Sequence, residues 1–67
     1  MFATIKNINS GINYENIILH IEIIEDKRYV DYYLSGTVRY DQHPKLTLDT
    51  FLKRNNIEII KEFERVI

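Results

Sequence analysis

The sequence predicts an α+β fold, in which a small antiparallel β-sheet packs against one short helix in the order ββαβ. Three observations predict it. Apolar and polar residues alternate over positions 17–24 and 29–40, a charged break at 25–28 separates these two runs, and apolar residues after Pro44 recur at helical spacing. The chain of 67 residues is expected to form a single domain, 1–67.

The first elements are an optional edge strand, a turn and a long strand. Residues 2–8 form a short apolar segment that we interpret as an extra N-terminal strand at the edge of the sheet. Residues 9–13 predict a turn, because serine, glycine and asparagine favour turn conformations. Residues 17–24 predict the first long strand. Its core face would consist of Ile17, Leu19, Ile21 and Ile23.

Residues 29–40 predict a second long strand, paired antiparallel with the first through the charged break. Gly36 lies inside this run and marks either a bulge or a bend. Residues 41–45 are then expected to form a loop. The core face of the second strand would consist of Val30, Tyr32, Leu34 and Val38, and its outer face would carry Tyr29, Asp31 and Tyr33.

A short helix is predicted to begin at Thr47 or Asp49, because threonine and aspartate both cap helix N-termini. It is expected to end at residues 55–56, since asparagine tolerates the left-handed conformation that follows a helix. The apolar face of this helix, at the i, i+3 and i+4 positions, consists of Leu48, Phe51 and Leu52.

Residues 57–67 fit either a helix or a strand by periodicity, with the helix slightly favoured. A hairpin with one short helix makes a poor core, however, and a further strand completes the sheet. We therefore predict a strand over 57–67.

No residue pattern in the chain indicates an enzyme. His20 and His43 lack the additional ligands at suitable spacing that a metal site requires, and neither serine lies in a nucleophile motif. The chain has no cysteine, which excludes a disulfide scaffold and thiolate zinc sites. We expect no catalytic activity, no cofactor and no metal.

Charge and apolar content limit the partners. A formal net charge of -1 argues against general nucleic-acid binding, which uses a basic surface. No apolar run approaches the roughly 18 residues of a membrane span, and the first residues lack signal-peptide features, so we expect a cytoplasmic protein without a membrane partner. Apolar residues make up 45% of the chain, including twelve isoleucines, which is more than one small core is expected to hide. This excess predicts a homodimer.

Four of the five tyrosines, Tyr29, Tyr32, Tyr33 and Tyr40, fall within twelve residues. In a strand, alternate members of this group face away from the core, which places Tyr29 and Tyr33 beside Asp31. Three interpretations remain open: cross-strand packing, a protein contact surface and a base-stacking platform. The acidic side chain between the tyrosines disfavours base stacking.

Residues 27–67 resemble the small phage-encoded uracil-DNA glycosylase inhibitors of the short dimeric type. Three segments carry the resemblance: KRYVDY at 27–32, LTLDTF at 46–51, and EIIK at 58–61 followed by the terminal Val66-Ile67. The resemblance implies a ββαβ subunit that forms a homodimer. In that family the helices of the dimer line an apolar groove, which receives the leucine that the glycosylase otherwise inserts into DNA. Acidic residues beside the groove take the positions of DNA phosphates.

By position, Asp31 matches the acidic residue of that family and Phe51 matches its groove phenylalanine. Where the family has a helix tyrosine near the groove, this chain has Asn55 or a neighbouring residue. The resemblance thus implies a phage inhibitor that occludes the DNA-binding groove of a host uracil-DNA glycosylase. Two alternatives stay open: a phage inhibitor of another host defence or DNA-processing protein, and a small single-stranded nucleic-acid-binding module. The candidate partner-binding residues are Tyr29, Asp31, Tyr33, Leu48, Phe51, Leu52 and Asn55.

Overall fold

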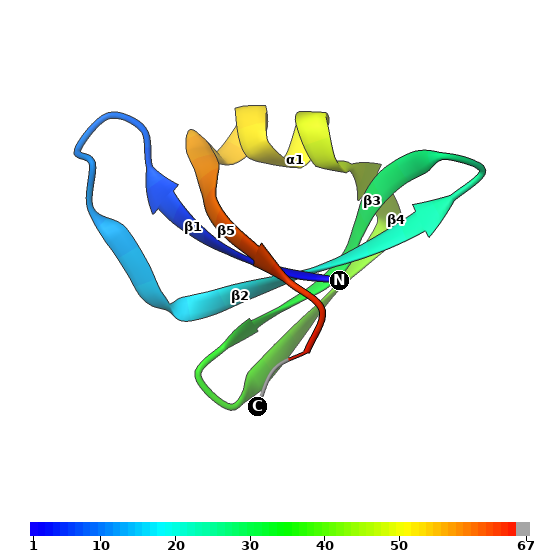
Figure 1. Ribbon diagram of the computed structural model, residues 1–67, viewed down its shortest axis with the longest axis horizontal. Coiled ribbons are helices and arrows are strands. Elements are labelled where there is room, and N and C mark those ends of the chain that lie inside the picture. Colours follow the sequence, from blue (N-terminus) through cyan, green and yellow to red (C-terminus); the bar gives the residue numbers. More distant parts are fainter. Residues whose placement is uncertain (66–67) are drawn as a thin grey trace.

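The computed structural model describes residues 1–65 and has an α+β fold, with a five-stranded antiparallel sheet and one short helix (Figure 1). The strand order across the sheet is β4-β3-β2-β1-β5. The elements in chain order are β1 (Phe2–Asn7), β2 (Asn13–Ile24), β3 (Lys27–Ser35), β4 (Val38–Thr47), α1 (Leu48–Asn55) and β5 (Ile57–Phe63).

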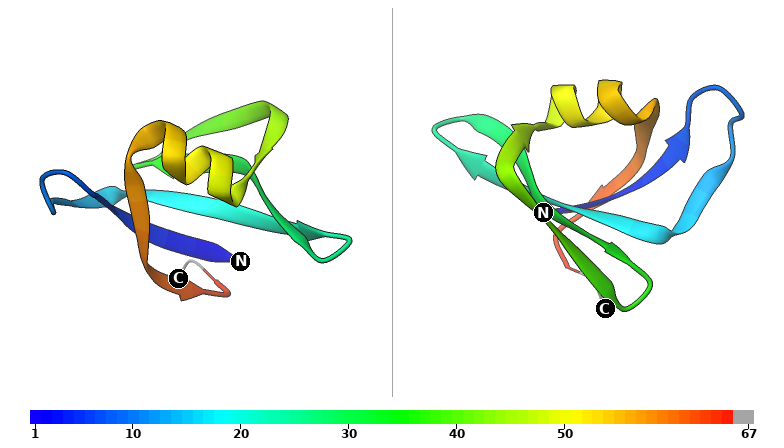
Figure 2. Two further views of the ribbon diagram at one scale, coloured as in Figure 1. Left: turned by 90° about the horizontal axis from the view of Figure 1, so that it is seen from above. Right: turned by 180° about the vertical axis from the view of Figure 1, so that it is seen from behind.

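The sheet is strongly curved, and α1 lies across its concave side (Figures 1 and 2). Because α1 connects β4 to β5, it links the two edge strands of the sheet. The apolar face of the helix and the inner face of the sheet therefore enclose the core. The buried residues of this core are Ala3, Ile5, Leu19, Ile21, Val30, Leu48, Phe51 and Ile57.

The predicted N-terminal strand is present. The prediction that it lies at the edge of the sheet is wrong. β1 pairs with β2 on one side and with β5 on the other. The helix returns the chain to the free side of β1, where β5 adds as the last strand. This central position explains why Ala3 and Ile5 are almost fully buried.

The predicted hairpin after the first long strand is confirmed, and its turn is tight. Glu25 and Asp26 form the turn with φ angles of 49° and 67°. Two residues with positive φ match the twist of antiparallel strands.

The second predicted strand, 29–40, is two strands. Gly36 and Thr37 form a turn between β3 and β4, so that the chain reverses where we expected one continuous strand. Gly36 has a φ of 62°, which glycine adopts without a steric penalty. The predicted order, ββαβ with an extra N-terminal strand, has four strands, whereas the structure has five in the order βββββ with α1 before the last.

The predicted helix ends are confirmed. The Thr47 hydroxyl accepts a hydrogen bond from the Thr50 backbone N–H at 3.4 Å, and Asn56 ends the helix with a φ of 52°. The choice of a strand after the helix is also confirmed, over Ile57–Phe63. The strand is shorter than the predicted 57–67, because Glu64 and Arg65 are not part of it, and residues 66 and 67 lie outside the described residues. No helix among residues 1–65 is both long enough and apolar enough to cross a membrane.

Two strands contain segments that leave the regular pairing. Residues 14–17 of β2 stand opposite only Ile5 of β1, and residues 42–45 of β4 stand opposite only Asp31 of β3. Such insertions bend a strand and turn it away from its neighbour. The loop predicted at 41–45 is therefore part of β4, and most of its residues lie within one of these segments.

Candidate functional site in the groove between helix and sheet

An open groove of about 460 Å³ lies between α1 and the inner face of the sheet. This volume falls within the range of about 300–1,000 Å³ that is typical of ligand pockets. Most of the lining is apolar, with a few polar groups. The lining residues are Ile5, Tyr14, Ile17, Leu19, Tyr33, Gln42, Leu46, Phe51, Arg54, Asn55 and Ile57.

The two irregular segments help to form this groove. Tyr14 and Ile17 belong to the inserted residues of β2, and Gln42 belongs to those of β4. The pairing of β4 with β3 resumes at Leu46, which also lines the groove. We infer that strands bent away from the regular ladder leave space that side chains do not fill.

Two aromatic rings form part of the groove wall. The ring centroids of Tyr33 and Phe51 lie 6.1 Å apart with a tilt of 56°. Tyr33 also stacks on Tyr40 at 5.0 Å, which fixes its orientation. Phe51 is only 5% exposed, so the same ring serves the core and the groove.

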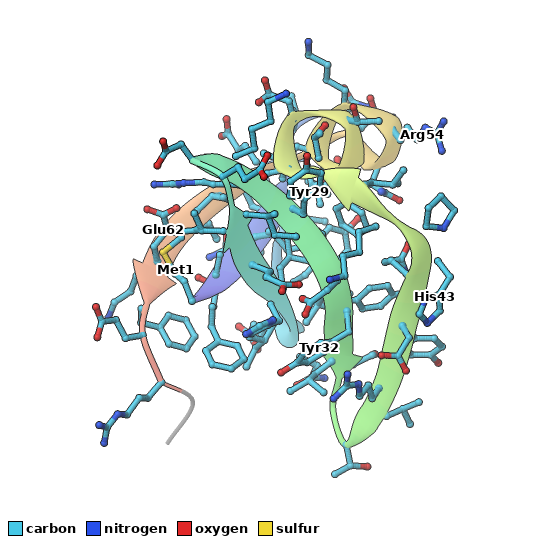
Figure 3. The ribbon with its side chains drawn as sticks, turned by 90° about the vertical axis from the view of Figure 1, so that its right-hand side faces the viewer. Met1, Tyr29, Tyr32, His43, Arg54 and Glu62 are labelled. Atoms are coloured by element: carbon cyan, nitrogen blue, oxygen red, sulfur yellow. The ribbon has the colours of Figure 1, made fainter. Side chains whose placement is uncertain are left out.

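The polar groups of the groove come from several elements. The Asn7 side-chain amide donates to the Tyr14 hydroxyl at 3.2 Å, and the Asn55 amide donates to the Phe51 carbonyl at 2.9 Å. Arg54 is the only charged residue of the lining, and none of the ion pairs formed within residues 1–65 includes it. Figure 3 shows Arg54 projecting from α1 on the side of β4.

The opposite face of the sheet carries a row of neighbouring side chains, one from each strand. Tyr32 stacks on His20 at 4.6 Å, and the Arg39 guanidinium lies 3.8 Å from the Tyr32 ring centroid. The Phe2 ring meets the His20 ring edge-on, with centroids 4.9 Å apart, and stacks with the Phe63 ring at 6.1 Å. Across the sheet from β5 to β4, the row consists of Phe63, Phe2, His20, Tyr32 and Arg39.

Asp31 lies beside this row and is held in place, whereas the sequence suggested a freely exposed acid. Its carboxylate lies 2.6 Å from His20 Nδ1 and accepts the Tyr32 backbone N–H at 3.0 Å. A carboxylate accepts hydrogen bonds, so Nδ1 of His20 is the donor. The Asp31 side chain is 19% exposed.

Asp31 also changes which residues face the core. It is an extra residue of β3 between Val30, which pairs with Ile21, and Tyr32, which pairs with His20. Val30 and Tyr33 therefore face the core, and Tyr32 faces outward. The prediction that Tyr32 lies on the core face with Val30, and that Tyr33 lies outside with Asp31, is wrong because this bulge shifts the alternation by one residue.

The candidate residues from the sequence do not form one site. Tyr33, Phe51 and Asn55 meet at the groove, whereas Leu48 is buried and Leu52 packs against the core. Tyr29 and Asp31 lie elsewhere on β3, and Figure 3 shows Tyr29 close to the start of α1, well away from Tyr32.

Only three of the eleven groove residues were predicted as contacts, and the eight that were missed include Tyr14, Ile17, Gln42 and Arg54. Tyr14 precedes the alternating run and Gln42 lies in a predicted loop. The residues next to them in the sequence therefore do not indicate that the two side chains line the same groove. Only the pairing of the strands brings them to the same groove.

On the outer face, the Tyr32 ring and the Lys45 charge both have partners. Tyr32 lies between His20 on β2 and Arg39 on β4, so neighbours cover both sides of its ring. Lys45 donates to Glu22 at 2.6 Å. This hydrogen bond, together with the nearby carboxylates, raises the pKa of the Lys45 ammonium group above its usual value. This arrangement favours cross-strand packing over a base-stacking platform.

Within residues 1–65, no three His, Cys, Asp or Glu side chains gather in a way that could hold a metal ion. Comparisons of the chain with protein-family models, curated proteins and solved structures found no match.

Proposed function

We propose that this protein is a phage-encoded inhibitor that binds a host uracil-DNA glycosylase in the host cytoplasm and occludes its DNA-binding groove. The observation that carries the proposal is the apolar groove beside α1, which is lined by Phe51. By position, Phe51 matches the groove phenylalanine of the family that residues 27–67 resemble; the groove of that family is lined by the helices of two subunits, whereas this groove lies within one chain. The protein itself catalyses nothing in this proposal and acts by steric exclusion.

The groove offers a physical basis for binding a protruding side chain. Tyr33, Phe51 and Leu46 form apolar walls, so an aliphatic side chain of the enzyme would leave water on entering. Burying a side chain of leucine size contributes about 1.5–3 kcal/mol. The apolar groove therefore favours a partner that presents one exposed aliphatic residue.

Asp31 is the second contact in this proposal, in place of a DNA phosphate, and it lies on the face of the sheet opposite the groove, so the enzyme would have to reach both faces. His20 and the Tyr32 backbone hold its carboxylate in one orientation, so less conformational freedom is lost on binding. The remaining exposed oxygen surface would accept hydrogen bonds from groups that otherwise grip DNA. Hydrogen bonds to a charged group are worth about 1.5–3 kcal/mol.

Asp31→Asn is expected to weaken inhibition about tenfold, since losing about 1.4 kcal/mol of contact energy is a factor of ten. The measurement is uracil excision from a labelled oligonucleotide by a bacterial glycosylase, titrated with each protein. Circular dichroism and urea denaturation of the variant will separate a binding effect from a folding effect, because Asp31 also bonds to His20.

The matched control is Asp26→Asn, which removes the same charge from the β2–β3 turn. Asp26 has a φ of 67°, which asparagine tolerates. Inhibition by this variant should equal that of the wild type. Equal inhibition by the wild type and Asp31→Asn would remove Asp31 from the contact. If excess wild type leaves excision unchanged, the glycosylase is not the target, and another host defence or DNA-processing protein takes its place in the proposal.

We also propose that the chain acts as a homodimer. Among residues 1–65, seven large apolar side chains are exposed: Ile8, Ile12, Ile23, Ile24, Val38, Tyr40 and Ile60. A second copy would cover part of this surface. Light scattering at micromolar concentration is expected to return about twice the chain mass of 8.1 kDa. A mass of one chain at every concentration would contradict the dimer.

A further inference from the structure

The charges around the groove are unbalanced. The lining contains one cation, Arg54, and no carboxylate. Within residues 1–65, Lys6, Arg28, Arg39 and Lys45 form ion pairs, whereas Arg54, like Lys27, Lys53 and Lys61, takes part in none, so its position at the groove is what distinguishes it. An apolar groove with one unneutralised guanidinium favours a ligand that has an apolar body and a negative charge.

We propose that the groove binds a small amphipathic carboxylate, with its apolar body against Tyr33 and Phe51 and its carboxylate at Arg54. This inference rests on the groove itself and does not depend on the identity of a protein target. Guanidinium binds carboxylate through two parallel N–H···O bonds, which gives such a pair both strength and a defined orientation.

Neutral hydrogen-bonding groups near the groove support the same ligand chemistry. The Tyr14 hydroxyl accepts from Asn7 and so keeps its own proton for donation. The Gln42 amide also lines the groove and can donate. A cationic ligand would find no carboxylate in the lining, and a fully apolar ligand would make no ion pair with the Arg54 guanidinium.

The test compares decanoate with 1-decanol, which has the same chain length without the charge. Isothermal titration calorimetry, below the micelle concentration of decanoate, measures binding of each ligand to the wild type and to Arg54→Gln. We expect saturable binding of decanoate to the wild type and about tenfold weaker binding to Arg54→Gln, a change of about 1.4 kcal/mol. The affinity for 1-decanol should be the same in both proteins.

Lys53→Gln is the matched control, because Lys53 is the neighbouring helix cation and does not line the groove. It should bind decanoate as the wild type does, and an equal loss in both variants would indicate general charge attraction and overturn the Arg54 contact. A second variant, Gln42→Trp, places a large ring at the groove and should reduce the binding of both ligands. Its fold can be verified by circular dichroism.

Absence of saturable decanoate binding to the wild type would overturn the proposal, as would undiminished binding to folded Gln42→Trp. These titrations contain no glycosylase, so their failure is distinct from a failure of the inhibitor proposal.

Discussion

Replacing Phe51 with alanine is expected to lower the free energy of unfolding by about 3–5 kcal/mol. The side chain is 5% exposed and is the largest of the core residues on α1, where it contacts the sheet through Tyr33. Its removal leaves a cavity at the main contact between helix and sheet. Urea denaturation at a fixed protein concentration measures the loss, since a dimer would make stability depend on concentration.

Lys53→Ala is the matched control on the same helix, because Lys53 is exposed and should change stability by about 0.5 kcal/mol or less. A milder variant, Phe51→Leu, should keep the fold and weaken binding of the partner if the ring lines the binding groove. A loss below about 1 kcal/mol for Phe51→Ala would contradict its place in the core. Unchanged inhibition by folded Phe51→Leu would count against the role of the groove.

Leu19→Ala is expected to cost about 2–5 kcal/mol of stability, because Leu19 is 1% exposed at the centre of the sheet. The informative comparison is Ile23→Ala on the same strand. The alternating pattern places both residues on one face, yet Ile23 is 60% exposed near the end of β2. Its truncation should cost about 0.5 kcal/mol or less, measured by the same denaturation experiment.

A loss at Ile23 as large as that at Leu19 would contradict the exposure of this residue in a single chain. It would indicate that another surface covers Ile23 in solution. Repeating both measurements at a tenfold lower concentration would then reveal whether that surface belongs to a second copy, because only an intermolecular contact weakens on dilution.

The local features of this fold could be predicted from neighbouring residues alone. Thr47 at the start of α1 and Asn56 at its end have side chains and backbone preferences that act within a few residues. The alternation over β2 and the charged turn that follows it likewise depend on near neighbours, and both predicted the hairpin with β3.

Part of the candidate site was predicted from the sequence. The apolar spacing of α1 placed Phe51 on the apolar face of the helix, and the resemblance to the inhibitor family named Phe51 and Asn55 as groove residues. Tyr33 was predicted as a contact residue but assigned to the wrong face. Its true position depends on the extra residue at Asp31.

Which residues share a surface depends on the pairing of strands that are distant in the chain. The bulge at Asp31, the irregular pairing of residues 14–17 with β1 and of residues 42–45 with β3, and the place of β1 between β2 and β5 all arise from pairing between distant parts of the chain. A one-residue change in register moves every following side chain to the opposite face. Short-range periodicity contains no information about that register, so the groove and the contact between His20 and Asp31 are properties of the assembled sheet.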